Sequence, residues 1–394
     1  MSPGFPKSSF PVLPLILLVA LFYLNFVARV IMAPLLPVVE TEMGLGHGQA
    51  GSFFFFVAVG YGVGLLGSGW ASSVLTHRLT IAAAGMLGGA ALILISQCSS
   101  MSGIRCGLVL VGIFAGLYLP SGISTLTELV PREHWGKAMA IHELAPSLAF
   151  TTTPLIAEFL LKFFSWRGAL IVLASAAVVM PVIFLLYGRG SRGRGDPPTL
   201  RLLGEVASKP VCWGMGVFFM VSIGSSYGAY TMMPLFLVAG LGMERPWANT
   251  LIGLSRTFSI AALFVSGWMI DRMGPRLSMT VFLISTGAFT LLLGLVREPA
   301  YVAVLVFCQA ASVACLFPIG FTIVSLLFPQ RLRGVAVSLV ILIGFLLGGG
   351  MVPSAIGYWA ESFSFSSAFA LLGVIGLLLL PLFLRMGSGL NLSR

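Results

Sequence analysis

The chain is predicted to be an all-α integral membrane protein whose twelve transmembrane helices form two six-helix bundles. Three observations carry this prediction. Hydrophobic residues make up 58 % of the sequence and charged residues only 9 %, whereas a soluble domain carries about 25 % charged residues. Twelve apolar stretches are long enough to cross a bilayer. The second half of the chain also repeats features of the first half in register.

The apolar stretches are identified by length, because a helix needs about 20 apolar residues to cross the bilayer. They cover residues 11–38, 48–70, 80–98, 103–130, 136–161, 166–187, 211–238, 246–269, 277–296, 299–328, 334–361 and 366–386. Most of the loops between them are short, but a basic, Gly/Pro-rich segment lies in the middle of the chain. We therefore predict a first bundle over 1–187, a linker over 188–210 and a second bundle over 211–394.

Rare residues recur at a fixed offset. Ser68–Trp70 recurs 198 positions later as Ser266–Trp268, and Pro120 recurs as Pro318. A shared apolar composition would align Leu with Leu rather than Pro with Pro. Six spans in each half give both halves the same orientation, which is the parallel repeat that many solute transporters use.

The basic residues are distributed unevenly. The net charge is +10, and most of the 22 Lys and Arg residues fall in the predicted linker, loops and tails on the side of the two termini. The opposite side receives Arg105, Lys162, Arg167, Arg245 and Arg297. Because cytoplasmic loops carry the excess of Lys and Arg, we predict that both termini are cytoplasmic. The short loops favour a bacterial inner membrane.

The same rule explains the Arg-Gly run of the linker, which resembles an RNA-binding tail only superficially. We expect no nucleic-acid partner. The five Cys residues show no metal-binding or disulfide spacing, and we expect no metal or cofactor.

Residues 267–276 read GWMIDRMGPR and resemble the signature loop of the major facilitator superfamily, G-x-x-x-D-R-x-G-R-R. The first-half copy, residues 69–78, has Ser73 in place of the acid. Trp166–Arg167 at the start of span 6 and Pro34–Pro37 at the end of span 1 are further resemblances. The family implies transport by alternating access, function as a monomer, and a cavity lined by spans 1, 4, 7 and 10 with parts of 2, 5, 8 and 11.

The resemblance also implies a cytoplasmic gate. Its candidate residues are Gly267, Asp271, Arg272, Gly274 and Arg276, with Arg78 and Glu128 in the first half. Asp271 at a helix end can accept hydrogen bonds from the backbone of the next helix and pair with a basic residue, which would hold the two halves together. Glu128 has two interpretations, a part in this gate or a surface pair with Arg132.

Two arginines lie within apolar spans, where an ionisable residue is costly and therefore a functional candidate. Arg256 lies near the middle of span 8, and Arg29 lies past the middle of span 1. If Arg29 pairs with Glu143 of span 5, Arg256 remains an uncompensated cation that an anionic substrate would neutralise. A guanidinium suits a carboxylate, and an Arg in span 8 resembles the carboxylate carriers of this family. The alternatives are that Arg256 extends toward the membrane surface or binds backbone carbonyls of span 7 or 10, and that Arg29 forms a purely structural pair with Glu143.

Glu143 is the acid that the sequence places deep in the bundle, and His142 precedes it. A buried carboxyl favours its protonated form, and His titrates near neutral pH, so both are candidates for proton coupling. Adjacent helical residues point about 100° apart, so the two cannot both face the cavity squarely.

Polar and aromatic residues on the cavity helices are secondary substrate-binding candidates, with packing as the alternative for each. They are Asn25, Tyr61, Tyr118, Tyr227, Tyr230 and Gln309. Tyr227 and Tyr230 share one face of span 7 because they are three residues apart.

These observations favour a secondary transporter that takes up a small organic anion, such as a carboxylate, together with protons, within membrane lipids. Export of drugs or apolar metabolites is the alternative, but Ile141–Ala149 keeps only the Pro of the family's efflux motif. A receptor or assembly factor is an alternative from another class. No nucleophile–base cluster indicates an enzyme, and no Walker sequence indicates ATP use.

Overall fold

The computed structural model describes residues 12–188, 193–195 and 200–388, and this part of the chain contains helices and no strand. It has eleven helical segments that are long and apolar enough to cross a membrane. One of them, α12 (Arg245–Leu295), is 51 residues long and is interrupted at Gly274, where φ is 79° and ψ is 160°. Because about 20 residues cross a bilayer, α12 holds two spans, and the predicted total of twelve is confirmed.

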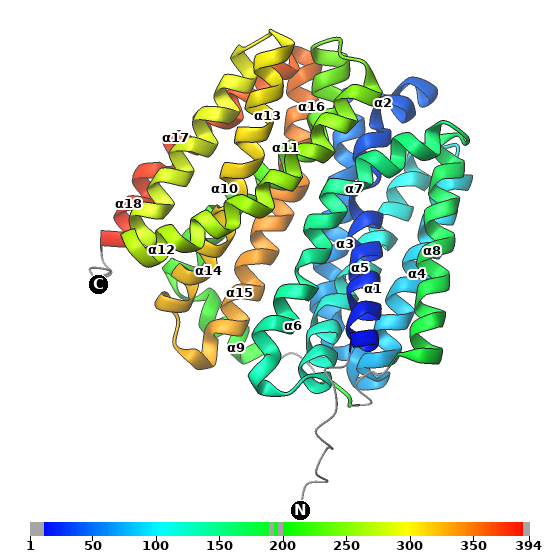
Figure 1. Ribbon diagram of the computed structural model, residues 1–394, viewed down its shortest axis with the longest axis vertical. Coiled ribbons are helices and arrows are strands. Elements are labelled where there is room, and N and C mark those ends of the chain that lie inside the picture. Colours follow the sequence, from blue (N-terminus) through cyan, green and yellow to red (C-terminus); the bar gives the residue numbers. More distant parts are fainter. Residues whose placement is uncertain (1–11, 189–192, 196–199, 389–394) are drawn as a thin grey trace, which may run out of the picture.

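The first half forms six spans, which lie together on one side of the molecule (Figure 1). Its helices are α1 (Val12–Val30), α2 (Met32–Met43), α3 (His47–Val74), α4 (His77–Gln97), α5 (Met101–Leu129), α6 (Trp135–His142), α7 (Leu144–Leu161) and α8 (Trp166–Tyr187). α1 and α2 together form the first span, and α6 and α7 form the fifth.

The second half forms six spans beside the first. Its helices are α10 (Pro210–Ile223), α11 (Ala229–Leu235), α12, α13 (Pro299–Ala314), α14 (Leu316–Leu327), α15 (Gln330–Gly344), α16 (Val352–Ser362), α17 (Phe365–Leu378) and α18 (Leu380–Ser388). The π-helical segments η2 (Gly224–Gly228) and η3 (Phe236–Gly240) flank α11, and η4 (Phe345–Met351) joins α15 to α16.

Prolines explain the breaks within several spans. Proline has no backbone N–H, so it leaves the carbonyl of the residue four positions earlier without its helical partner. α1 ends at Val30, four residues before Pro34, and α6 ends at His142, four residues before Pro146. α13 ends at Ala314, which is likewise four residues before Pro318.

The sequence repeat is also a structural repeat. Gly44 and Gly242, which are 198 residues apart, both adopt positive φ at the end of the first span of their half. Arg78 donates to the carbonyls of Leu185 and Gly188 at the end of α8, and its counterpart Arg276 donates to the carbonyl of Leu384 in α18. Each of these arginines therefore ties the third span to the last span of its own half.

The linker contains a short helix, α9 (Leu200–Ala207), which packs on α15 and whose Glu205 pairs with Arg331. Gly193 accepts a hydrogen bond from the His77 amide. Residues 189–192 and 196–199 of the predicted linker lie outside the described part of the chain. We call the ends of the helices near α9 the linker side, and the opposite ends the far side.

The two halves meet along two seams, and α2 also packs against α11. α7 packs against α12, and α3 packs against α16 and η4 (Figure 1). Glycines allow the close approach of the second seam, because a Cβ atom on Gly51 would lie 2.5 Å from the carbonyl oxygen of Pro353, and one on Gly357 would lie 2.2 Å from that of His47. These contacts join the beginning of α3 to α16, in the far-side part of the span that α15, η4 and α16 form, so they close the far side.

Candidate functional site

Arg29 lies in the last turn of α1 and is 5 % exposed. Its guanidinium carbon is 4.2 Å from the ring centre of Tyr61, 4.6 Å from that of Phe26 and 4.7 Å from that of Phe345. Phe345 belongs to the second half, so Arg29 lies where the halves meet. Its buried Nε atom has no hydrogen-bond partner among the described residues.

Arg256 lies on α12 and is 6 % exposed. Its Nη2 atom donates to the carbonyl of Ser226 in η2 at 3.1 Å. Its guanidinium carbon is 4.9 Å from the ring centre of Tyr230 and 5.2 Å from that of Phe150, which belongs to the first half. The carbonyl contact is the alternative that the sequence allowed for Arg256, and it leaves the positive charge unneutralised.

The two arginines belong to one group of aromatic residues, which we call the central cluster. Its members are Phe26, Arg29, Tyr61, Phe150, Tyr227, Tyr230, Arg256 and Phe345. Tyr227 connects the Arg29 end of the cluster to the Arg256 end. Its ring centre lies 5.0 Å from that of Phe345 and 6.2 Å from that of Phe150.

Tyrosine hydroxyls of the central cluster bind the backbone of the other half. Tyr227 donates to the carbonyl of Arg29 at 3.0 Å, and Tyr230 donates to the carbonyl of Phe150 at 3.1 Å. Within the described residues, neither Arg29 nor Arg256 forms an ion pair with an acid. The cluster therefore holds two buried cations at the meeting point of the halves.

The pairing of Arg29 with Glu143 that the sequence allowed does not occur. The Glu143 side chain is 58 % exposed, and its Oε1 lies 3.2 Å from Nδ1 of His142. Glu143 lies at the break between α6 and α7. The carboxylate of Glu143 is therefore exposed, and not buried as the sequence led us to expect.

His142 is fully buried and forms a short polar chain. Its Nε2 lies 3.2 Å from the Tyr118 hydroxyl, which itself donates to the carbonyl of Leu18 at 2.8 Å, and the ring of Phe22 stacks on the imidazole at 4.4 Å. Since the single hydroxyl proton of Tyr118 goes to Leu18, the oxygen of Tyr118 accepts from Nε2–H. Nδ1 and the Glu143 carboxylate can then form a hydrogen bond only if one further proton is held between them.

The remaining secondary candidates lie in four places. Tyr61 lies in the central cluster and Tyr118 lies beside His142. Gln309 is buried on α13 and donates to the carbonyl of Ser225 at 2.8 Å, next to the carbonyl that Arg256 binds. Asn25 donates to the carbonyl of Ala115 at 3.3 Å and lines a small pocket inside the first half.

The residues predicted for a cytoplasmic gate lie on the linker side. Asp271, Arg272 and Glu128 are exposed, and Asp271 forms no hydrogen bond or ion pair with the described residues. Gly274 supplies the turn inside α12, and a Cβ atom on Gly267 would touch nothing.

The contacts that Arg78 and Arg276 make do not match the predicted gate. Each binds carbonyls of the last span in its own half, rather than a residue of the other half. Their observed contribution is to hold each bundle together.

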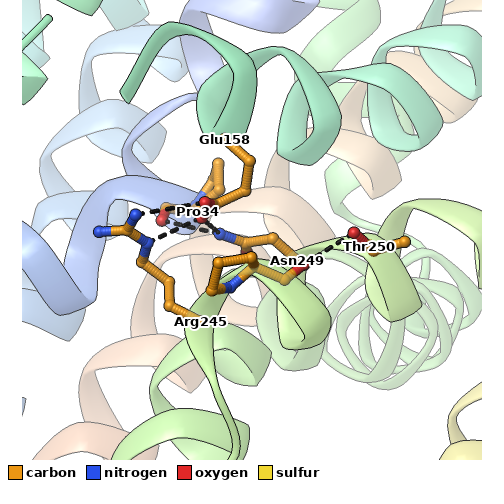
Figure 2. Close-up of polar contacts among 6 residues, drawn as sticks. Pro34, Glu158, Arg245, Asn249 and Thr250 are labelled. Atoms are coloured by element: carbon orange, nitrogen blue, oxygen red, sulfur yellow. Dashed lines mark hydrogen bonds and ion pairs between the residues drawn. The ribbon is translucent and has the colours of Figure 1, made fainter. Parts of the chain in front are cut away.

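Sequence reasoning missed a polar cluster at the far side, which Figure 2 shows. The Glu158 carboxylate on α7 accepts from Nε of Arg245 at 2.9 Å and from Nδ2 of Asn249 at 2.6 Å. Asn249 is fully buried, and its Nδ2 also lies 3.3 Å from the carbonyl of Pro34. A signal was available, because Glu158 is an acid inside the predicted fifth span. The prediction named Glu143 of the same span instead.

Known proteins resemble the chain in sequence and in fold. A family model described as Major Facilitator Superfamily matches residues 17–297 and 247–389. The cis,cis-muconate transport protein of Acinetobacter baylyi is 22 % identical over 362 residues, which cover 85 % of this chain and 84 % of that protein.

Two solved structures show the same fold. A transporter of the POT family in complex with 5-aminolevulinic acid has a TM-score of 0.82 at 13 % identity, with 99 % of both chains covered. A bacterial homologue of the human lysosomal transporter Spinster, in an inward-facing and occupied conformation, has a TM-score of 0.77 at 15 % identity, with 98 % of this chain and 96 % of that chain covered.

Proposed function

Because the chain belongs to the major facilitator superfamily and is a membrane transporter rather than an enzyme, we propose that it takes up a small organic anion, with carboxylate groups, together with protons. Arg256 anchors the anion, and Arg29 provides a second cationic contact. The linker side faces the cytoplasm of a bacterial inner membrane, in accord with the basic residues on that side.

The observation that carries this proposal is the pair of buried arginines in the central cluster. A buried cation without a counter-ion costs several kcal/mol, and an anion bound between the halves would offset that cost. The planar guanidinium fork suits a carboxylate, and the surrounding rings offer flat apolar surfaces to the carbon skeleton. An uncharged or cationic cargo would leave the cost in place, which disfavours drug efflux.

The muconate transport protein supports the anion assignment. Muconate carries two carboxylates, and the central cluster presents two guanidinium groups connected through the rings of Phe345, Tyr227 and Phe150. We therefore favour a dicarboxylate with an unsaturated, planar skeleton, because such a skeleton can stack on these rings.

Proton coupling is assigned to Glu143, His142 and Tyr118. The geometry accommodates one proton between Nδ1 of His142 and the Glu143 carboxylate, and the exposed Glu143 can exchange that proton with water on the linker side. His142 connects this exposed group to the buried interior of the first half through Tyr118.

The test is uptake of radiolabelled mono- and dicarboxylates, cis,cis-muconate among them, into proteoliposomes with and without an inward acid gradient. Gradient-driven uptake by the wild type that is lost in Arg256→Gln would support the proposal. Arg105→Gln is the matched control, because Arg105 also lies over a phenylalanine ring, at 5.1 Å from Phe56, but outside the central cluster. Carboxylate uptake that is absent, or equal in Arg256→Gln and wild type, would contradict it.

A further inference from the structure

We infer that Glu158, Arg245 and Asn249 form the latch that holds the two halves together on the far side, and that this latch must separate before substrate can reach Arg256 from that side. The inference deepens the proposed function by naming the gate of the same site. It requires alternating access and does not depend on the identity of the substrate.

The first argument is that the Glu158 carboxylate and its three donor atoms come from different halves. Glu158 belongs to α7 of the first half, whereas Arg245 and Asn249 belong to α12 of the second half (Figure 2). Nε of Arg245 lies 2.9 Å from Oε1, Nη2 lies 3.3 Å from Oε2, and Nδ2 of Asn249 lies 2.6 Å from Oε1. A two-pronged, charge-assisted contact of this kind fixes both distance and orientation.

The second argument is burial. Glu158 is 9 % exposed and Asn249 is fully buried, so the ionised carboxylate depends on its partners from the other half. Removing Arg245 leaves the buried carboxylate without a counter-charge, which is strongly unfavourable. Separation of the halves also admits water, which hydrates the same carboxylate, so the open state is accessible.

The third argument is an unsatisfied atom in the closed state. Oδ1 of Asn249 is buried and has no hydrogen-bond partner among the described residues. A buried acceptor without a donor is unfavourable, and water entering the open seam would satisfy it. The closed latch therefore combines a strong ion pair with the energetic cost of the unsatisfied Asn249 oxygen. This combination suits a contact that must repeatedly form and break.

The fourth argument is the position of the latch above the substrate site. Asn249 and Arg256 are seven residues apart on α12, about two helical turns or roughly 10 Å, and so lie on the same helix face. Between them, a Cβ atom on Gly253 would lie 2.7 Å from the carbonyl of Thr151 in α7. The α7–α12 seam thus runs from the latch to Arg256 and is tightly packed between them.

Another far-side ion pair lies within one half and provides a control. Glu42 on α2 pairs with Arg167 on α8 and accepts from Nε1 of Trp166 at 2.9 Å. All three residues belong to the first half, so breaking this pair does not release the second half. The α3–α16 seam has a different contact, in which Glu361 accepts from the Gly48 amide at 3.0 Å.

The test is hydrogen–deuterium exchange of the full chain in lipid nanodiscs, without substrate. In Glu158→Gln and in Arg245→Gln, we expect exchange at the end of α7 and the beginning of α12 to become at least roughly fivefold faster. We expect slower exchange at the linker-side ends of α6 and α15, because the halves rock about their centre. The charge reversal E158R/R245E should restore the wild-type pattern, and Glu42→Gln should leave both seams unchanged.

Release of the latch changes exchange in opposite directions on the two sides, whereas loss of folding accelerates exchange throughout the protein. The two outcomes can therefore be distinguished. Uniform acceleration, or no change in Glu158→Gln, would overturn the inference. Because no substrate is present, this result is independent of the carboxylate uptake that tests the proposed function.

Discussion

Tyr227 donates a hydrogen bond to the backbone carbonyl of Arg29, which is its own counterpart in the other half of the repeat. The two residues are 198 positions apart, the offset at which Ser68–Trp70 recurs as Ser266–Trp268. Counterparts can touch each other only close to the axis that relates the two halves. This contact therefore marks the axis and places Arg29 beside it, at the centre of the carrier.

Tyr227→Phe removes that hydroxyl and leaves the buried Arg29 carbonyl without this partner. We expect a loss of stability of about 1 kcal/mol, the usual net value of one buried hydrogen bond. Thermal unfolding of the purified protein would measure it. The exposed Tyr187 provides the control, and equal unfolding temperatures for Tyr227→Phe and Tyr187→Phe would contradict the role of this contact.

Arg29→Gln and Arg256→Gln should differ in how they alter substrate preference. If Arg256 anchors one carboxylate and Arg29 contacts a second, Arg256→Gln raises KM for mono- and dicarboxylates alike. Arg29→Gln raises it selectively for dicarboxylates, by about 10- to 100-fold for a lost charge-assisted contact. Initial rates in proteoliposomes give both values, with Arg105→Gln as the reference. An equal effect of Arg29→Gln on both classes would reject the two-point binding.

Glu143→Gln and His142→Gln should uncouple transport from protons. Each change removes one of the two groups that hold the additional proton, so an inward acid gradient no longer drives accumulation, whereas exchange of labelled for unlabelled substrate persists. Glu133→Gln is a matched control, because Glu133 lies 3.7 Å from His134 at an exposed position. Gradient-driven accumulation that survives in both variants would remove Glu143 and His142 from the coupling mechanism.

Gly51→Ala should hinder closure of the far side. The added methyl group would lie 2.5 Å from the backbone oxygen of Pro353, and this oxygen cannot move without shifting α16. We expect about tenfold slower uptake, in accord with a bias of roughly 1.4 kcal/mol against the closed state. Gly67→Ala on the same helix is the control, because nothing lies within 4 Å of its added Cβ. Equal rates in the two variants would show that the seam tolerates a side chain at Gly51.

The sequence predicted the spans and the repeat because hydropathy and rare residues such as Trp and Pro are local signals. The same signals located the turn at Gly274. The π-helical segment η2 could not be predicted, since nothing in the pattern of Gly224–Gly228 distinguishes it from an α-helix. Its Ser225 and Ser226 carbonyls nevertheless hold Gln309 and Arg256.

The two acids of the fifth span show why burial was harder to predict. Glu143 looked deep by its distance from the span's start, but Pro146 breaks the helix beside it and exposes its carboxylate. Glu158 lies near the end of the span, yet it is buried because Arg245 and Asn249 cover it from 87 and 91 residues away in the sequence. Contacts between residues so far apart in the sequence cannot be predicted from the hydropathy of a single helix.

The linker is attached to both bundles, and its covalent length sets a mechanical limit on transport. Its Gly195 amide binds the carbonyl of Ser72 at the end of α3, while α9 begins at Leu200 and packs on α15. Five residues of extended chain span at most about 18 Å. While both attachments hold, the linker side can open only as far as this tether allows, so the linker limits the amplitude of the rocking motion.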